Sequence, residues 1–234
     1  MRAPLYEGKA KRLFETEDPN VLRVEYKDEA TAFNGEKHDV MEGKAKLNNE
    51  LSALFFREIE ESGIPVHFQE KISETEQLVT KTEIIPLEVV VRNRVTGSLE
   101  KRTGLEEGTI INPAIVEFYY KDDALGDPLL NEDHIRLLGA ATTEELVEMK
   151  RLALLVNNVL TSHLEAAGLL LIDFKLEFGR LGNDGEVIVA DEISPDTCRF
   201  WDAQTHEKLD KDVYRLGTGK LQDAYEQVRA RIGG

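Results

Sequence analysis

Residues 169–179, LLLIDFKLEFG, combine a strongly apolar run with charges at every second position near its end. If the run is a β-strand, its side chains alternate between two faces. One face is then wholly hydrophobic and consists of Leu170, Ile172, Phe174, Leu176 and Phe178. The other face begins at Leu169 and Leu171 and ends with Asp173, Lys175 and Glu177. Burying charges is costly unless they are paired, hydrogen-bonded or bound to a metal, so the run predicts a strand that carries a polar site.

A second strand is predicted at residues 186–193, after the turn sequence NDG at residues 183–185. A three-residue hairpin loop with glycine in the left-handed conformation would pair Glu177 with Asp191. A two-residue Asp-Gly turn would instead pair Glu177 with Glu192. In both registers two carboxylates meet across neighbouring strands, where like charges destabilise each other.

A hard divalent cation with oxygen ligands would relieve this repulsion. Magnesium takes one or two protein carboxylates, with phosphate and water completing its shell, so Glu177 and Asp191 are candidate ligands. In the alternative interpretation, Lys175 neutralises its neighbours and the face is simply solvated. The hydrophobicity of both strands favours the wall of a cleft over an open surface, and hence metal binding.

A third predicted strand carries the opposite charge. Within residues 84–98, IIPLEVVVRNRVTGS, Arg92 and Arg94 share a strand face with Glu88. Two guanidinium groups at this spacing form a fork suited to a carboxylate or phosphate, although an internal salt bridge would explain them equally well. The glycine in the following turn permits close backbone approach and Ser98 adds a hydroxyl, which favours ligand binding.

The N-terminal segment YEGKAKR, residues 6–12, joins a glycine to three cations just before a predicted strand. Lys9 and Lys11 could act as point charges over a polyphosphate. The segment has neither the Walker spacing GxxxxGK[ST] nor the GxGxxG pattern, and a solvated basic turn would look the same.

Composition limits the partners. The 234 residues include 29 Lys and Arg against 45 Asp and Glu, and the net charge of −16 argues against nucleic acid and anionic membranes. A local basic pocket could still hold a small anion. The only cysteine is Cys198, and the N-terminus has no apolar signal core, so we expect a cytoplasmic protein.

Hydrophobic periodicity predicts an α+β fold. Strands are expected at residues 11–16, 21–26, 77–84, 87–95 and 114–120, and helices at residues 43–62, 143–167 and 221–232. With the hairpin, this order fits two lobes, a β-rich N-terminal lobe of residues 1–85 and a larger lobe of residues 86–234.

Taken together, these segments resemble the SAICAR synthetase family over essentially the full chain. Residues 84–98 and LIDFKLEFG at residues 171–179 are similar to two long signatures of that family. YEGKAK at residues 6–11, DEISPDTCRFWD at residues 191–202 and DKD at residues 210–212 also fit its pattern. Residues 31–46 depart from the pattern, so the resemblance assigns no role to residues 34–39.

The resemblance implies an ATP-dependent ligase of de novo purine biosynthesis. Such an enzyme condenses 5-amino-1-(5-phosphoribosyl)imidazole-4-carboxylate with L-aspartate through an acyl phosphate. It also implies a nucleotide-binding lobe like the N-lobe of protein kinases, a larger ATP-grasp-like lobe for substrates and metal, Mg²⁺ as cofactor, and a homodimer. A small-molecule kinase with the same ATP and metal site is the alternative.

The resemblance also assigns roles to residues of this sequence. It implies ATP binding by Gly8, Lys9, Ala10, Lys11, Lys81 and Ile84, and magnesium binding by Glu177 and Asp191. It implies that the anionic groups of the substrates are held by Arg92, Arg94, Ser98, Arg199, Lys211 and Arg215. The catalytic residues would be Lys175, Asp173 and Asp212, of which the two aspartates are candidate bases for the amine of L-aspartate.

Overall fold

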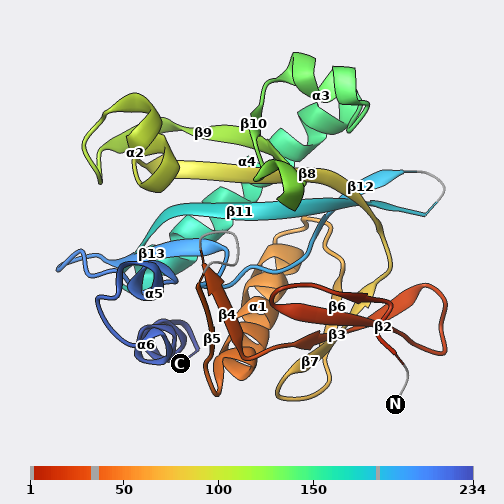
Figure 1. The fold of residues 1–234 in the computed structure, drawn as a ribbon, viewed down its shortest axis with the longest axis horizontal. Coiled ribbons are helices and arrows are strands. Elements are labelled where there is room, and N and C mark those ends of the chain that lie inside the picture. Colours follow the sequence, from red (N-terminus) through yellow and green to blue (C-terminus); the bar gives the residue numbers. More distant parts are fainter. Residues whose placement is uncertain (1–2, 33–36, 183–184, 234) are drawn as a thin grey trace.

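The structure, a computed structural model, describes residues 3–32, 37–182 and 185–233. Its N-terminal part is built on a five-stranded sheet in the order β1-β2-β3-β7-β6 (Figure 1). These strands are β1 (Tyr6–Glu7), β2 (Lys11–Glu15), β3 (Val21–Tyr26), β6 (Phe68–Lys71) and β7 (Glu76–Thr80). A separate pair of strands, β4 (Glu29–Ala32) and β5 (Lys37–Val40), lies beside it.

The second sheet has six antiparallel strands in the order β10-β9-β8-β11-β12, with β13 also paired to β11. Its members are β8 (Glu83–Arg94), β9 (Ile110–Tyr120), β10 (Leu129–Leu130), β11 (Leu169–Leu181), β12 (Glu186–Ala190) and β13 (Cys198–Asp202). Three strands therefore hydrogen-bond to β11, which puts its charged residues at the centre of the sheet.

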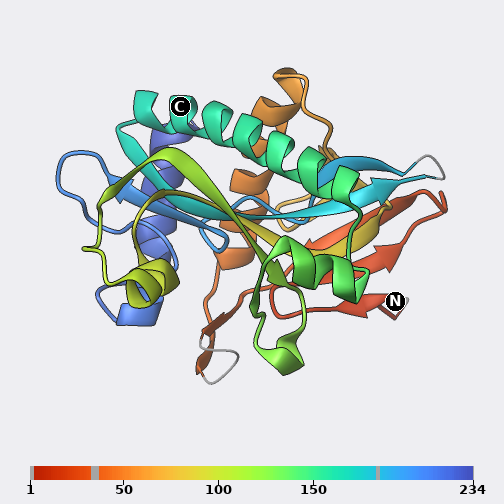
Figure 2. The same cartoon turned by 90° about the horizontal axis from the view of Figure 1, so that it is seen from above.

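Several helices accompany the two sheets. They are α1 (Lys44–Glu61), α2 (Gly97–Thr103), α3 (Glu132–Leu138), α4 (Thr143–Ala166), α5 (Asp212–Leu216), α6 (Leu221–Ile232) and the 3₁₀ helix η2 (Asp123–Leu125). The long helix α4 crosses one face of the larger sheet (Figure 2). It starts with a capping box, in which Thr142 and Glu145 satisfy each other's backbone N–H groups.

One apolar core joins the two parts of the molecule. Phe55 and Phe56 of α1 belong to the same buried cluster as Val89 of β8, Met149 of α4 and Phe174 of β11. The connection between the sheets, residues 81–82, also packs closely against β11. A Cβ atom on Gly179 would lie 2.5 Å from Oγ1 of Thr82, so only glycine leaves room for this crossing.

The α+β, two-lobed fold predicted from the sequence is confirmed, and the three predicted helices are present with ends shifted by at most a residue or two. The predicted break between residues 84 and 87 was wrong, because β8 continues through Pro86. This proline lies beside a β-bulge in the pairing of β8 with β11, a place where a strand tolerates proline. A short helix that the sequence analysis did not predict, α2, lies between β8 and β9. The division at residue 85 stays a prediction.

The predicted faces of β11 were only partly correct. Leu169 and Leu171 belong to the same buried cluster as Phe174, whereas Leu170 is half-buried. The alternation changes phase at a β-bulge between Leu171 and Asp173 in the pairing with β13. An extra residue in a bulge reverses the side-chain alternation, and this places Asp173 away from the apolar core.

Among the helices of the described residues, none combines the length and the apolar character that crossing a membrane requires.

Candidate active site

The β11–β12 hairpin has a register that differs from both predictions. Glu177 lies opposite Ala190, so the predicted pairings of Glu177 with Asp191 and with Glu192 were wrong. The loop spans residues 182–185, which is longer than either turn considered, and its middle two residues lie outside the described part of the chain.

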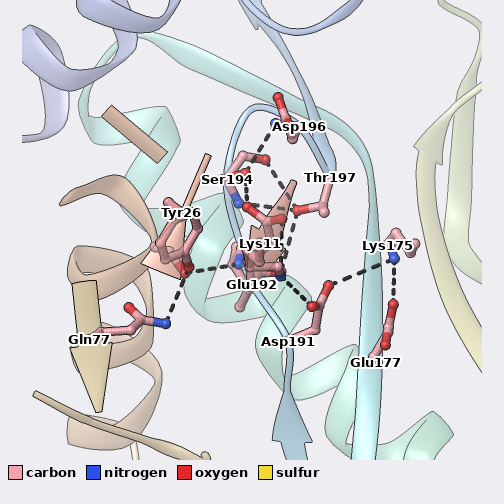
Figure 3. A network of polar contacts seen from close by, with 12 residues as sticks. Lys11, Tyr26, Gln77, Lys175, Glu177, Asp191, Glu192, Ser194, Asp196 and Thr197 are labelled. Atoms are coloured by element: carbon pink, nitrogen blue, oxygen red, sulfur yellow. Dashed lines mark hydrogen bonds and ion pairs between the residues drawn. The ribbon is translucent and has the colours of Figure 1, made fainter. Parts of the chain in front are cut away.

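Carboxylates nevertheless converge on this part of the sheet. On its other side Glu177 pairs with Glu88 of β8. Asp191 directly follows β12 with φ of 65°, a left-handed conformation that aspartate tolerates. The Nζ atom of Lys175 lies 2.7 Å from Glu177 and 3.8 Å from Asp191 (Figure 3). It also lies 3.0 Å from Glu88. One ammonium group thus contacts three carboxylates.

Two more lysines complete this cluster. Lys11 of β2 forms an ion pair with Asp191 and lies 3.1 Å from Oε1 of Glu192. Lys121, which follows β9, forms an ion pair with Glu177. We call these lysines, Lys11, Lys121 and Lys175, together with Glu88, Glu177, Asp191 and Glu192, the lysine–carboxylate cluster.

The buried charges of this cluster stabilise one another. Burial alone would lower the pKa of Lys11 and Lys175, but Asp191 and the glutamates beside them raise it above its usual value. Burial alone would raise the pKa of Asp191, but Lys11 and Lys175 hold it well below its usual range. Both lysines and Asp191 are therefore charged at neutral pH.

A histidine fixes the backbone of Asp191. His67, between α1 and β6, donates from Nε2 to the carbonyl oxygen of Asp191 at 3.1 Å. Burial lowers the pKa of His67 to about 4, so the imidazole is neutral near pH 7 and adds no cation to the cluster.

The donor set fits magnesium. Glu177 and Asp191 both contact the ammonium group of Lys175, and two neighbouring carboxylates agree with the preference of Mg²⁺ for one or two protein carboxylates. Within the described ranges no group of three or more His, Cys, Asp or Glu side chains is arranged to hold a metal. A metal here would complete its shell with phosphate and water.

A second network surrounds Arg92 of β8. Its guanidinium donates to Glu117 at 2.7 Å, to Asp173 at 2.6 Å, to Ser98 at 3.0 Å and to the hydroxyl of Tyr119 at 3.1 Å. The side chains of Arg92 and Asp173 are each 4% exposed. An internal salt bridge, the alternative considered for this strand face, is therefore present at Arg92, with Asp173 of β11 and Glu117 of β9 as partners.

The network continues into β13 and α5. Arg199 donates to Asp173 at 2.9 Å and to Asp212 at 2.7 Å, and Asp212 also accepts from Arg215 at 2.6 Å. A Cβ atom on Gly97 would lie 2.9 Å from Arg199, so this glycine permits the close approach of α2. Burial alone would raise the pKa of Asp212, but Arg199 and Arg215 lower it.

A buried aspartate, Asp210, holds the backbone of β13 and α5 in place. It is fully buried, and its carboxylate accepts backbone N–H groups of Phe200 at 2.9 Å and Asp212 at 2.8 Å. Burial and the charge of Asp212 raise the pKa of Asp210 to about 7. The side chain joins β13 to the start of α5.

An open cavity of about 350 Å³ lies where the two networks meet. Among the predicted site residues, its lining includes Lys9, Arg92, Asp173, Lys175, Arg199, Lys211 and Arg215. Contacts to lining residues bring in Ser98, Glu177, Asp191 and Asp212. Lys11 joins them through its ion pair with Asp191. Burial lowers the pKa of Lys211.

Other predicted residues lie apart from this cavity. Arg94 donates to the carbonyl oxygen of Gly108 at 3.1 Å, and a bulge in the β8–β9 pairing separates it from Arg92. The predicted arginine fork is therefore not formed. Lys81 and Ile84 are exposed near the connection between the sheets.

Gly8 and Ala10 form the turn between β1 and β2. The N–H of Gly8 donates to the carbonyl of Lys11 at 2.9 Å, and the carbonyl of Ala10 accepts from Lys27 at 2.8 Å. At this turn Lys9 lies 2.7 Å from Asp123 of η2.

Several residues of the site escaped sequence reasoning. Lys121 is far from Glu177 in the chain, and no local pattern marks it. Asp196 lines the cavity and forms an ion pair at 2.7 Å with Lys44 of α1, whose side chain is 2% exposed. Burial alone would raise the pKa of Asp196, but Lys44 and Lys211 lower it. A lysine at the start of an amphipathic helix gives no sign that it is buried.

Comparison with known proteins gives consistent matches over the whole chain. The family model described as SAICAR synthetase matches residues 4–232. A phosphoribosylaminoimidazole-succinocarboxamide synthase of Bacillus cereus is 57% identical over 230 residues, which cover 98% of this chain and 96% of the relative. The crystal structure of the Ehrlichia chaffeensis protein of that name has a TM-score of 0.96 and 43% identity, covering 99% of this chain and 98% of that one. A SAICAR synthetase in complex with ADP has a TM-score of 0.94 and 48% identity, covering 97% and 96%.

Proposed function

Because the chain belongs to the SAICAR synthetase family, we propose that it is the ATP-dependent ligase that makes the succinocarboxamide of de novo purine biosynthesis. The substrates are ATP, 5-amino-1-(5-phosphoribosyl)imidazole-4-carboxylate and L-aspartate, and the other products are ADP and phosphate. The observation that carries the proposal is the cavity in which the lysine–carboxylate cluster meets the arginine network, in a chain 57% identical to a synthase of that name.

The reaction needs an activated carboxylate. A carboxylate does not form an amide with an amine in water, because its oxygen is a poor leaving group. Transfer of the terminal phosphoryl group of ATP gives an acyl phosphate and ADP. The amine of L-aspartate then displaces phosphate and loses a proton. Phosphoryl transfer depends on alignment and charge neutralisation more than on covalent participation by the protein.

The lysine–carboxylate cluster suits the phosphates. Lys9 and Lys11, with the backbone of Gly8 and Ala10, are proposed to hold them at the β1–β2 turn, and the ADP complex of a 48% identical neighbour supports nucleotide binding. Lys81 and Ile84 are proposed to lie on the adenine side, near the connection between the sheets. Glu177 and Asp191 would hold Mg²⁺, which would neutralise phosphate charge there.

The arginine network suits the anionic groups of the ribotide and L-aspartate. Arg199, Lys211 and Arg215 line the cavity and are proposed to bind these groups, with Arg92 and Ser98 behind them. Asp173 and Asp212 are both ion-paired with arginines. This pairing favours a role in orienting the guanidinium groups over a role as the base. Lys175 is proposed to orient phosphate from β11.

The test is ADP release by the purified chain with ATP and Mg²⁺, with the ribotide carboxylate and L-aspartate omitted in turn. We expect release to require both substrates. Full-rate release without L-aspartate would favour a small-molecule kinase, and no release with any combination would refute catalysis.

Matched arginine variants locate the anion site. Arg199→Met should raise the KM for the ribotide or for L-aspartate by about 10- to 100-fold, the effect of one charge-assisted hydrogen bond. Arg136→Met, whose side chain is 76% exposed on α3, should leave both KM values near those of the parent. Unchanged KM values in Arg199→Met would count against this assignment. The homodimer and the cytoplasmic location stay predictions.

A further inference from the structure

The carboxylates assigned to magnesium are already in contact with ammonium groups. Glu177 contacts Lys175 at 2.7 Å and also pairs with Lys121. Asp191 pairs with Lys11 and lies 3.8 Å from Lys175. The Nζ atom of Lys175 contacts both carboxylates, so a metal shared by both would compete with this ammonium (Figure 3).

Glu177 is shielded from water, and the lysines around the two carboxylates are shielded to different degrees. The side chain of Glu177 is 4% exposed, whereas those of Lys11, Lys175 and Lys121 are 14%, 25% and 40% exposed. A divalent cation entering alone would have to break buried charge-assisted hydrogen bonds and approach three ammonium groups. Repulsion between cations is strong where water is scarce, so the lysines oppose the metal.

A nucleotide changes this balance because its phosphates offer the lysines other partners. Lys11 belongs to the turn proposed to hold the phosphates. Asp123, two residues after Lys121 in the chain, pairs with Lys9 of the same turn at 2.7 Å. Phosphate oxygens that attract these lysines would free oxygens of Glu177 and Asp191 for the metal.

We propose that the three lysines make divalent-metal binding at Glu177 and Asp191 conditional on nucleotide. Metal alone binds weakly, and nucleotide and metal strengthen each other's binding by the same factor, as linkage requires. This inference rests on the proposed function, because it takes the nucleotide to be the ligand of the β1–β2 turn.

The test measures Mn²⁺ binding to the full chain without nucleotide, by electron paramagnetic resonance of the free ion. Mn²⁺ stands in for Mg²⁺ because both prefer oxygen ligands. Lys121→Met should tighten Mn²⁺ binding about tenfold or more, since the metal no longer has to displace that ammonium. The side chain of Lys121 is 40% exposed, so its replacement should leave the fold intact.

Two further variants make the result specific. Lys175→Met should tighten Mn²⁺ binding at least as much, because this lysine contacts both carboxylates. Lys101→Met removes the same charge from an exposed position on α2 and should bind Mn²⁺ like the parent. Parent and Lys121→Met chains with equal Mn²⁺ affinity would overturn the inference, as would equal tightening by Lys101→Met.

Titration of the parent with ADP at saturating Mg²⁺ separates this inference from the proposed function. We expect ADP to bind the parent and to bind more weakly when the metal is removed. ADP that binds equally well without metal would overturn the inference alone. A parent that does not bind ADP in the presence of metal would overturn the proposed nucleotide site.

Discussion

Replacing Arg92 should destabilise the protein far more than replacing Arg94, although the two occupy one strand two residues apart. Arg92 makes hydrogen bonds to four side chains and is buried, whereas Arg94 donates to one backbone carbonyl. Removing one partner of a buried ion pair costs about 3–5 kcal/mol. Asp173 keeps Arg199 as a partner, so we expect about 3 kcal/mol for Arg92→Met.

For Arg94→Met the loss of a single hydrogen bond should cost about 1 kcal/mol. In a chain of this length these values correspond to falls in Tm of about 6–12 °C and about 2–4 °C. Urea unfolding followed by fluorescence of the only tryptophan, Trp201, measures both, because that side chain is buried in β13. Arg92→Lys should recover little of the loss, since an ammonium cannot reproduce the guanidinium fork. Equal losses for the Arg92→Met and Arg94→Met variants would refute the reasoning.

Three further predictions test other parts of the site. The pKa of Asp210 is raised to about 7, so between pH 4 and pH 7 the folded protein keeps a proton that the unfolded chain has released. This proton stabilises the folded protein, and the stabilisation is lost as the pH rises toward 7. The stability of Asp210→Asn relative to the parent should therefore increase between pH 5 and pH 8, and a pH-independent difference in urea unfolding would contradict the assignment. Gly179→Ala should lower the free energy of unfolding by about 1–3 kcal/mol through its clash with Thr82. Adding Thr82→Gly should restore part of this loss. A Gly179→Ala melting temperature equal to the parent's would show that residues 81–82 can move away without cost. Asp212→Asn should lower kcat/KM but keep the shape of the parent's pH–rate profile, because the ion-paired Asp212 has a lowered pKa; disappearance of an acidic limb would identify Asp212 as the base after all.

The sequence analysis identified polar residues that lie near one another better than it identified how they pair. Alternation identified Asp173, Lys175 and Glu177 as a polar group on an apolar strand, and the structure brings all three to the cavity or its edge. Strand alternation depends only on local backbone geometry, so it can be read from a short segment. The capping box of α4 is local in the same way, because Thr142 and Glu145 are only three positions apart.

The features that the sequence analysis missed depend on β-bulges and on ion pairs between residues far apart in the chain. The bulge near Arg92 separates it from Arg94, and the bulge after Leu171 exchanges the faces of β11. A single extra residue in one strand has no clear signature in composition. The partnership of Lys121 with Glu177 joins strands far apart in the chain, so it follows from the sheet order and not from either segment.

The arginine network has a consequence for how this sequence can change over generations. Arg92, Asp173, Arg199, Asp212 and Arg215 alternate in charge along an unbroken path from β8 through β11 and β13 to α5. A mutation of Asp173, Arg199 or Asp212 leaves the residues that it contacts with an unbalanced charge in a buried position. Substitutions at these positions should therefore be accompanied by a second substitution that restores the balance. In homologous sequences, a change at one of these five sites should therefore be accompanied by a change at a site that it contacts.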